Sequence, residues 1–168
     1  MKMVIVEPYQ TIWPEKFQEI KREVEATLGN SVLRIEHVGS TSVPGLAAKP
    51  IIDLDVIIAD NACMDDVIRK LAAAGYIHEG DLGIIGREAF RYDAKPHLMK
   101  HHLYVCRESS GELYRHLTFR NYLRSHPDAV REYGSVKLEA AAQNPDSIEK
   151  YMEAKAPCIE RFYRQCGL

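Results

Sequence analysis

Hydrophobic residues recur along the chain with two different spacings, and these spacings predict the order of its helices and strands. Between Trp13 and Gly29 an apolar residue returns every three to four positions, as on one face of a helix. Residues 50–59 are almost all apolar, as in a buried strand. The same reasoning predicts a short edge strand at 3–7, further strands at 32–38, 76–79, 88–92 and 100–106, and helices at 63–74, 113–125, 127–143 and 147–166.

This order of elements predicts an α+β fold. Strands and helices mix in the first part, about 1–108, and only helices follow in the second, about 110–168. A length of 168 residues suits a single domain that buries about 70% of its unfolded surface. No repeat and no long linker divides the sequence, so we expect one domain over residues 1–168.

Two carboxylates interrupt the most apolar of the predicted strands. Successive side chains of a strand point to opposite faces, so Asp53 and Asp55 share one face while Leu54 points to the other. Two carboxylates inside a buried strand repel each other and lose hydration, and they require a cation, a proton or a cluster of donors. A divalent metal is the favoured interpretation; capping of neighbouring loops is the alternative.

Composition and charge narrow the classes of function. The net charge is −2, so the chain has no basic surface for coating nucleic acid or a membrane. No apolar run reaches the ~18 residues of a membrane span, and the first residues are too short for a signal peptide. The four cysteines follow no paired metal spacing, which indicates reduced thiols in a cytoplasmic protein.

Two lysines fall on or beside apolar helix faces. Lys155 lies on the stripe that contains Met152 and Ile159, and Lys137 directly follows Val136 on the preceding helix. A lysine on an inward face is costly unless it reaches solvent or binds an anion. We therefore expect both ammonium groups to share an anionic partner, with exposure at the margin of each stripe as the alternative.

Other basic and aromatic residues receive weaker assignments. Lys49 lies in the loop before the predicted aspartate strand, while Arg91 and Arg120 lie in a later strand and in the first of the last three helices. All three are candidate phosphate ligands, because Lys and Arg bind phosphate oxygens. A loop with glycines at 80, 83 and 86 is expected near the site. Solvated surface is expected for Arg124, Arg131, Arg161 and Arg164, and core positions for Tyr122, Tyr133 and Tyr151.

A family resemblance rests on particular motifs. Gly39-Ser40, a gap of twelve residues and then Asp53-Leu54-Asp55-Val56 is similar to the signature of the nucleotidyltransferase fold superfamily. The longer run 37–56, together with 119–127 and 133–137, resembles the GrpB family within it. The resemblance implies a small mixed sheet flanked by helices, with a helical bundle at the C-terminal end.

The resemblance also implies roles for residues. Asp53 and Asp55 would be catalytic and would hold Mg²⁺ or Mn²⁺ against a nucleoside triphosphate, while Gly39 and Ser40 would contact its phosphates. The chain departs from the superfamily in one respect, because the strand at 100–106 offers no third acidic residue. His102 could take that place as a metal ligand, which would favour Mn²⁺, Zn²⁺ or Fe²⁺; the alternative is a histidine hydrogen-bonded within the sheet.

Three functions remain open from the sequence. The first is a metal-dependent protein that binds a nucleoside triphosphate or related phosphometabolite and transfers a nucleotidyl group to a small acceptor. The second is a catalytically inactive module that binds a nucleotide or a coenzyme A-related ligand, which the missing carboxylate favours. The third is a metal-bound structural or partner-binding protein. Neither a nucleic-acid nor a membrane partner is expected, and the sequence identifies no protein partner, oligomeric state, base or acceptor.

Overall fold

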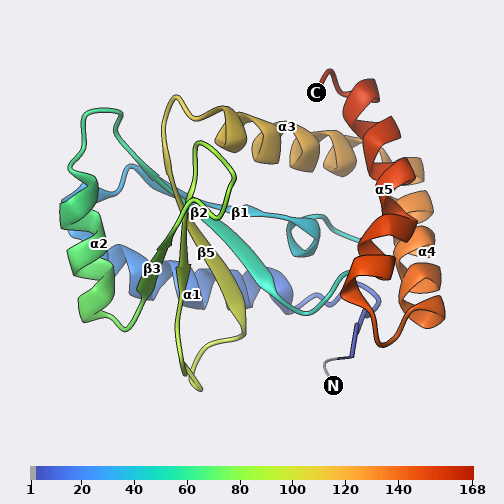
Figure 1. The fold of residues 1–168 in the computed structure, drawn as a ribbon, viewed down its shortest axis with the longest axis horizontal. Helices are drawn as coiled ribbons and strands as arrows, with labels where there is room; N and C mark the ends of the chain where they lie inside the picture. Colours follow the sequence, from blue (N-terminus) through green and yellow to red (C-terminus); the bar gives the residue numbers. More distant parts are fainter. Residues whose placement is uncertain (1–2) are drawn as a thin grey trace.

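The computed structural model describes residues 3–168 and confirms the α+β class. Strands and the first two helices are mixed up to residue 107, and three helices follow, so the predicted order of elements is confirmed with one exception treated below. Figure 1 shows a twisted sheet with helices on both sides and a pair of helices at one end. The strands are β1 (Arg34–Val38), β2 (Ile52–Ile58), β3 (Ile77–Gly80), β4 (Glu88–Arg91) and β5 (His101–Arg107), and the helices are α1 (Trp13–Leu28), α2 (Met64–Ala73), α3 (Gly111–Ser125), α4 (Pro127–Gln143) and α5 (Ile148–Gln165).

The sheet has five strands in the order β1-β2-β5-β4-β3. β2 pairs in parallel with β5, while the other neighbours are antiparallel, so the sheet is mixed. β2 is therefore flanked on both edges, which explains why its sequence is the most apolar of the five. In this register Asp53 lies beside His102, and Asp55 lies beside Tyr104.

One face of the sheet packs against α1 and α2. The buried side chains of α1, such as Trp13 and Ile20, form a single apolar core with Leu54 and Val56 of β2 and with Leu71 of α2. This arrangement leaves the odd-numbered positions Asp53 and Asp55 on the opposite face of β2, on the side where α3 crosses the sheet (Figure 1).

The helices α4 and α5 pack side by side at the end of the sheet (Figure 1). Their core includes Tyr133 of α4 and Phe162 of α5, and it also takes in Val43 and Leu46 from the loop between β1 and β2. This loop therefore joins the sheet to the helical part, and it places the residues that precede β2 against α4.

The N-terminal edge strand predicted at 3–7 is wrong. The segment forms only an isolated bridge between Glu7 and Ala48, and the Val4 amide donates instead to the Pro145 carbonyl at 2.8 Å. Val4 is buried against Ala140 of α4 and Tyr151 of α5. Burial against the two helices therefore directs this segment away from the sheet edge.

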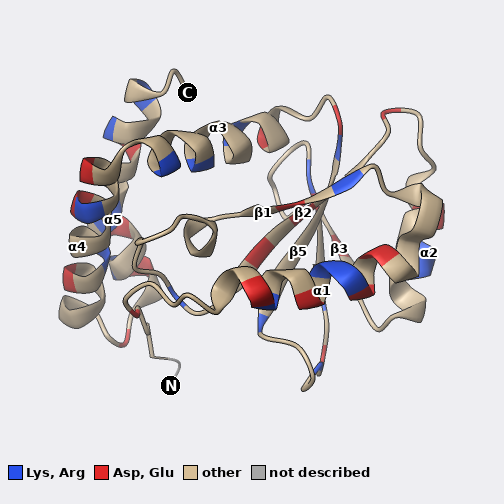
Figure 2. Cartoon of the chain, turned by 180° about the vertical axis from the view of Figure 1, so that it is seen from behind, with Lys and Arg blue, Asp and Glu red and all other residues tan. Residues whose placement is uncertain are grey.

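Charged residues of both signs alternate along α1 and α4 (Figure 2). This mixture agrees with the net charge of −2. Within residues 3–168, no helix is long and apolar enough to cross a membrane.

Candidate functional site

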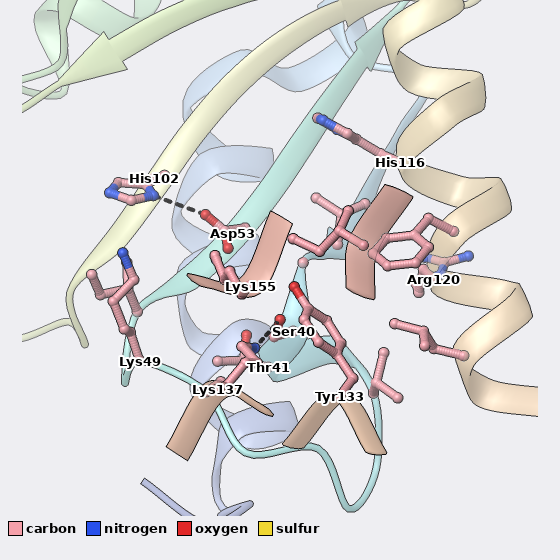
Figure 3. Close-up of a pocket in the computed structure, with 18 of the residues that line it drawn as sticks. Ser40, Thr41, Lys49, Asp53, His102, His116, Arg120, Tyr133, Lys137 and Lys155 are labelled. Atoms are coloured by element: carbon pink, nitrogen blue, oxygen red, sulfur yellow. Dashed lines mark hydrogen bonds and ion pairs between the residues drawn. The ribbon is translucent and has the colours of Figure 1, made fainter. Parts of the chain in front are cut away.

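Asp53 lies on the wall of a cavity of about 400 Å³ between the sheet and the helical part. The predicted alternation of β2 is confirmed, because Leu54 is buried on the α1 face while Asp53 and Asp55 share the other face. Figure 3 shows Asp53 pointing toward lysines that come from the β1–β2 loop and from the helical part.

The turn at Gly39 brings the backbone against the Asp53 side chain. Gly39 has a φ of 71°, and a Cβ atom there would collide with Asp53 Oδ2 and lie 3.0 Å from its Cγ. Only glycine adopts this conformation and leaves that space free. The predicted role of Gly39 in allowing a close approach therefore has a geometric basis, with the carboxylate as the neighbour.

His37 and two arginines hold the same turn in place. The His37 ring stacks on Phe17 with centroids 4.6 Å apart, and its Nε2 lies 2.9 Å from Thr41 Oγ1. Burial lowers the pKa of His37 to about 4, so the ring is neutral near pH 7. Arg120 donates to the His37 carbonyl at 3.0 Å and to Glu36 at 2.7 Å. It lines the cavity, as a phosphate ligand would, but Glu36 is already its anionic partner.

Arg124 is exposed, as predicted, and its guanidinium also contacts the Gly39 turn. Its Nε and Nη2 donate to the Ser42 carbonyl at 2.9 and 2.8 Å. Its residue type and its place on a helix gave no sign of this contact, because Ser42 lies 82 positions earlier in the chain. Arg124 therefore supports the turn that approaches Asp53.

Lys137 and Lys155 reach the same cavity as Asp53, as their inward positions predict. Lys137 is 2% exposed and donates to Ser40 Oγ at 2.5 Å and to the Ala47 carbonyl at 2.9 Å. Burial and the charges of Lys155 and Lys49 hold the pKa of Lys137 well below its ordinary range. Lys137 thus fixes the loop that contains Ser40 and adds positive charge beneath the cavity.

Lys155 has no such partner. It is 9% exposed, and within residues 3–168 its ammonium group has no hydrogen bond or ion pair; it lies 4.8 Å from the centroid of the Tyr151 ring. Burial and the charge of Lys49 lower the pKa of Lys155 to about 8, although Asp53 opposes this change. Lys49 lines the cavity too, so three lysines surround one carboxylate.

Asp55 does not line the cavity, although its predicted role as a metal ligand would place it there. It is fully buried, and His116 of α3 covers it, with Nδ1 2.6 Å from Asp55 Oδ2. The other ring nitrogen lies 3.1 Å from Glu112, so both nitrogens face carboxylates, and only a protonated imidazole has a donor for each. Burial alone would lower the pKa of His116, but the hydrogen bond to Asp55 and the charges of both carboxylates raise it.

The neighbouring strand β5 supplies no third carboxylate. His102 lies beside Asp53, and its Nδ1 is 2.8 Å from Asp53 Oδ1. Tyr104 occupies the corresponding place beside Asp55. His101 points to the opposite face, where it is buried and lies 2.7 Å from the Tyr76 hydroxyl, as its position in the strand predicts.

Arg91 is not part of this cavity, which corrects its assignment as a phosphate ligand. It pairs with Asp93 at 2.9 Å and with Glu79 at 3.7 Å at the far strands of the sheet. Arg87 lines the cavity instead, with its guanidinium 4.3 Å from the centroid of the Tyr104 ring. The sequence indicated only the glycine-containing loop that directly precedes Arg87, and not the arginine itself.

The carboxylates fit a metal ion in part. Within residues 3–168, no three histidine, cysteine, aspartate or glutamate side chains are arranged to hold one. However, Asp55 Oδ1 is buried without a hydrogen-bond partner, and Asp53 next to it on the same face is partly exposed. These two residues could hold an ion whose remaining ligands come from elsewhere, whereas His102 Nδ1 is already engaged by Asp53.

Known proteins share this fold and sequence. The profile of the family described as GrpB protein matches residues 3–165. A crystal structure of the conserved protein GrpB from Enterococcus faecalis is 39% identical, with a TM-score of 0.84 over 96% of each chain. A structure of the Cid1 poly(U) polymerase described as MgGTP-bound is 12% identical, with a TM-score of 0.55 over 78% of this chain and 42% of that one, and so shares the fold.

Curated relatives are longer than this chain. UPF0157 protein YqkA of Bacillus subtilis is 37% identical over 152 residues, which cover 90% of this chain and 44% of that protein. A protein named dephospho-CoA kinase from Mycolicibacterium paratuberculosis is 27% identical over 91% of this chain and 43% of its own length. The chain thus spans less than half of these two relatives. The profile match, the shared sequence and the nucleotidyltransferase-like fold together establish that the chain belongs to the GrpB family.

Proposed function

We propose that the cavity binds the phosphates of a nucleoside triphosphate or a related phosphometabolite, and that the chain transfers a nucleotidyl group to a small acceptor. The observation that carries this proposal is the buried ammonium group of Lys155, which has no partner within residues 3–168. A buried cation is costly unless an anion compensates it. Phosphate oxygens would supply that anion for Lys155 and for Lys49 on the same wall.

Asp53 is the carboxylate that would meet the ligand. Together with the unpartnered Asp55 Oδ1, it would hold a divalent ion such as Mg²⁺ or Mn²⁺, whose other ligands would be phosphate oxygens. Such an ion neutralises charge that develops on the phosphates during transfer. Because the protein offers only two carboxylates, we expect the ion to bind with the triphosphate rather than alone.

In the proposed transfer, one bond to the α-phosphorus forms and one breaks. An acceptor oxygen forms a bond to the α-phosphorus, the bond from that phosphorus to the bridging oxygen of the β-phosphate breaks, and pyrophosphate leaves. The proton of the acceptor passes to water. In this scheme Lys155 and Lys49 hold the phosphate chain, and Lys137 holds the Ser40 turn beneath it. The net charge of −2 favours a small acceptor over a nucleic acid.

A second candidate is a binding module without catalysis. Two observations favour it: β5 places His102 and Tyr104 where a third carboxylate would be needed, and His116 covers Asp55. The relative named dephospho-CoA kinase makes a coenzyme A-related ligand a reasonable compound for this module. Four free cysteines fit a reducing compartment such as the cytoplasm for either candidate.

Two measurements separate these candidates. Isothermal titration with ATP and with coenzyme A, each with and without Mg²⁺ or Mn²⁺, tests binding, and pyrophosphate release with small hydroxyl compounds tests transfer. Binding of ATP with release of pyrophosphate supports the transferase, whereas binding without release supports the module. Absence of binding to wild-type protein, for every triphosphate tested, would overturn the proposal. Asp53→Asn should weaken binding only in the presence of the metal.

A further inference from the structure

The polar groups on the cavity wall are unusual in kind. They are lysines and arginines, two histidines that contact Asp53 and Asp55, four tyrosines, one carboxylate, Asp53, and the hydroxyls of the Ser40 turn. Within residues 3–168, the wall contains no asparagine, glutamine or glutamate. Asparagine and glutamine amides and glutamate carboxylates are among the side chains that distinguish base edges by paired hydrogen bonds. The wall therefore lacks amide and glutamate groups for selecting a base, and its arginines are already engaged, Arg87 by the Tyr104 ring and Arg120 by Glu36.

The tyrosine hydroxyls do not replace those groups. The Tyr133 hydroxyl lies beside Ser40 (Figure 3), and the Tyr104 ring is covered by Arg87. The Tyr151 hydroxyl is buried without a partner, beneath the surface that a ligand could touch. Most of the tyrosines thus contribute ring surface rather than hydrogen bonds to the cavity.

The side of the wall contributed by α3 and α5 is aromatic. The rings of Phe119 and Tyr163 meet edge to face with centroids 4.8 Å apart, and Arg115 covers Tyr163 with its guanidinium 4.5 Å from the ring centroid. Ile159 lies on the same wall. Such a surface can stack on a base, and stacking tolerates every base because each one has a π-face.

Positive charge dominates the neighbouring part of the wall, where Lys155 lies one turn of α5 before Ile159. Lys49, Lys137 and Lys155 all lie on the wall, and Asp53 is the one carboxylate there within residues 3–168. A single carboxylate cannot compensate three protonated lysines. A ligand that brings two or more adjacent negative charges, as a polyphosphate chain does, would complete the balance.

We infer that the cavity recognises the polyphosphate chain of its ligand and accepts any base, so that inorganic tripolyphosphate is itself a ligand. The inference rests on the proposed binding of nucleoside triphosphates and specifies which part of them is recognised. The lysines contribute most of the binding, and the aromatic side adds stacking that differs little between purines and pyrimidines.

Isothermal titration of the wild-type chain at pH 7 with Mg²⁺ tests this inference. The ligands are ATP, GTP, CTP, UTP and inorganic tripolyphosphate. We expect the four nucleotides to differ by no more than about fivefold in Kd, and tripolyphosphate to bind within about twentyfold of them. A preference above about thirtyfold for one base, or nucleotide binding without tripolyphosphate binding, would overturn the inference and leave the proposed function standing. If none of the five binds, the proposed function itself fails.

Three variants assign the two sides of the cavity. Lys155→Met should weaken all five ligands by a similar factor, about tenfold or more. Lys150→Met provides the matched control, because Lys150 is exposed on the same helix and outside the cavity wall, and it should leave all five affinities unchanged. Phe119→Leu should weaken the nucleotides and spare tripolyphosphate. Equal losses for Lys150→Met and Lys155→Met would contradict a specific site for the phosphate chain.

Discussion

Lys155 combines three properties that seldom occur together in a stable protein: a charge, burial and the absence of an anionic partner within residues 3–168. The contact with the Tyr151 ring compensates this only in part, since the pKa of Lys155 still falls to about 8. Because Lys155 destabilises the ligand-free protein and faces the cavity, we attribute its position to ligand binding.

Lys155→Met should therefore stabilise the ligand-free protein at pH 7 by about 1–3 kcal/mol, because methionine fills the same stripe without a charge to desolvate. The advantage should shrink with pH. Below pH 8 Lys155 is protonated in both the folded and the unfolded wild type, so the full cost of burying its charge applies. Between about 8 and the ordinary lysine pKa of 10.5, Lys155 loses its proton in the folded chain and keeps it in the unfolded chain. Wild type thus gains stability in that window.

Urea denaturation of both proteins at pH 7 and at pH 10 measures this difference. A gap that stays constant between the two pH values would mean that Lys155 titrates normally. A methionine variant less stable than wild type at pH 7 would show that the ammonium group stabilises the ligand-free fold.

Gly39 supports a second prediction at this scale. Gly39→Ala must place a side chain at a φ of 71° and also displace Asp53, whereas Gly80→Ala has a nearly equal φ of 75° and open space around its Cβ. Both substitutions carry the backbone cost of about 1–2 kcal/mol, and we expect Gly39→Ala to cost at least about 1 kcal/mol more. Thermal unfolding of the two variants provides the comparison. Equal losses would mean that Asp53 moves aside without cost.

At the scale of elements, α3 decides how the two aspartates differ. The helix crosses the face of β2 that holds both carboxylates, and His116 and Glu112 enclose Asp55 while Asp53 stays in the cavity. The same strand therefore leaves Asp53 open to the cavity and encloses Asp55, of which only Oδ1 is without a partner.

His116→Leu should destabilise the protein by about 3 kcal/mol or more, because it leaves the Asp55 carboxylate buried without a donor. His116→Asn should recover much of that loss, since the asparagine amide can donate from nearly the place of Nδ1. Chemical denaturation at pH 6 distinguishes the two variants. If both lose the same stability, the Asp55 hydrogen bond contributes little and the ring acts by packing alone.

Elements whose pattern is local could be predicted from the sequence, and contacts across the fold could not. Alternation alone put Asp53 and Asp55 on one face of β2, and helical spacing alone turned Lys137 and Lys155 inward. The role of His116 required knowledge that α3 crosses β2, which depends on distant pairings. That Arg87 and not Arg91 lines the cavity depends on how β4 is placed against β5 and α3, which no residue pattern in that loop specifies.

At the scale of the whole molecule, the cavity lies where the sheet meets the helical part. Asp53 comes from β2, Lys49 from the loop before it and Lys155 from α5, so one ligand would touch segments about 100 residues apart in sequence (Figure 3). A ligand that binds only the folded arrangement stabilises it by mass action, by about 2.7 kcal/mol at one hundred times its Kd. The gain in stability should therefore appear in the sheet and in the helical part together.

Hydrogen exchange with and without tripolyphosphate and Mg²⁺ tests this coupling. We expect slower exchange in the Gly39–Lys49 loop and in α5 at the same ligand concentration, because the phosphate chain would be held from both sides. Lys155→Met should remove the protection of both segments together, since the ligand loses its contact with α5, and Lys150→Met should keep it in both. Protection confined to the loop would place the ligand on the sheet alone. In that case the burial of Lys155 would need an explanation other than a phosphate chain shared between β2 and α5.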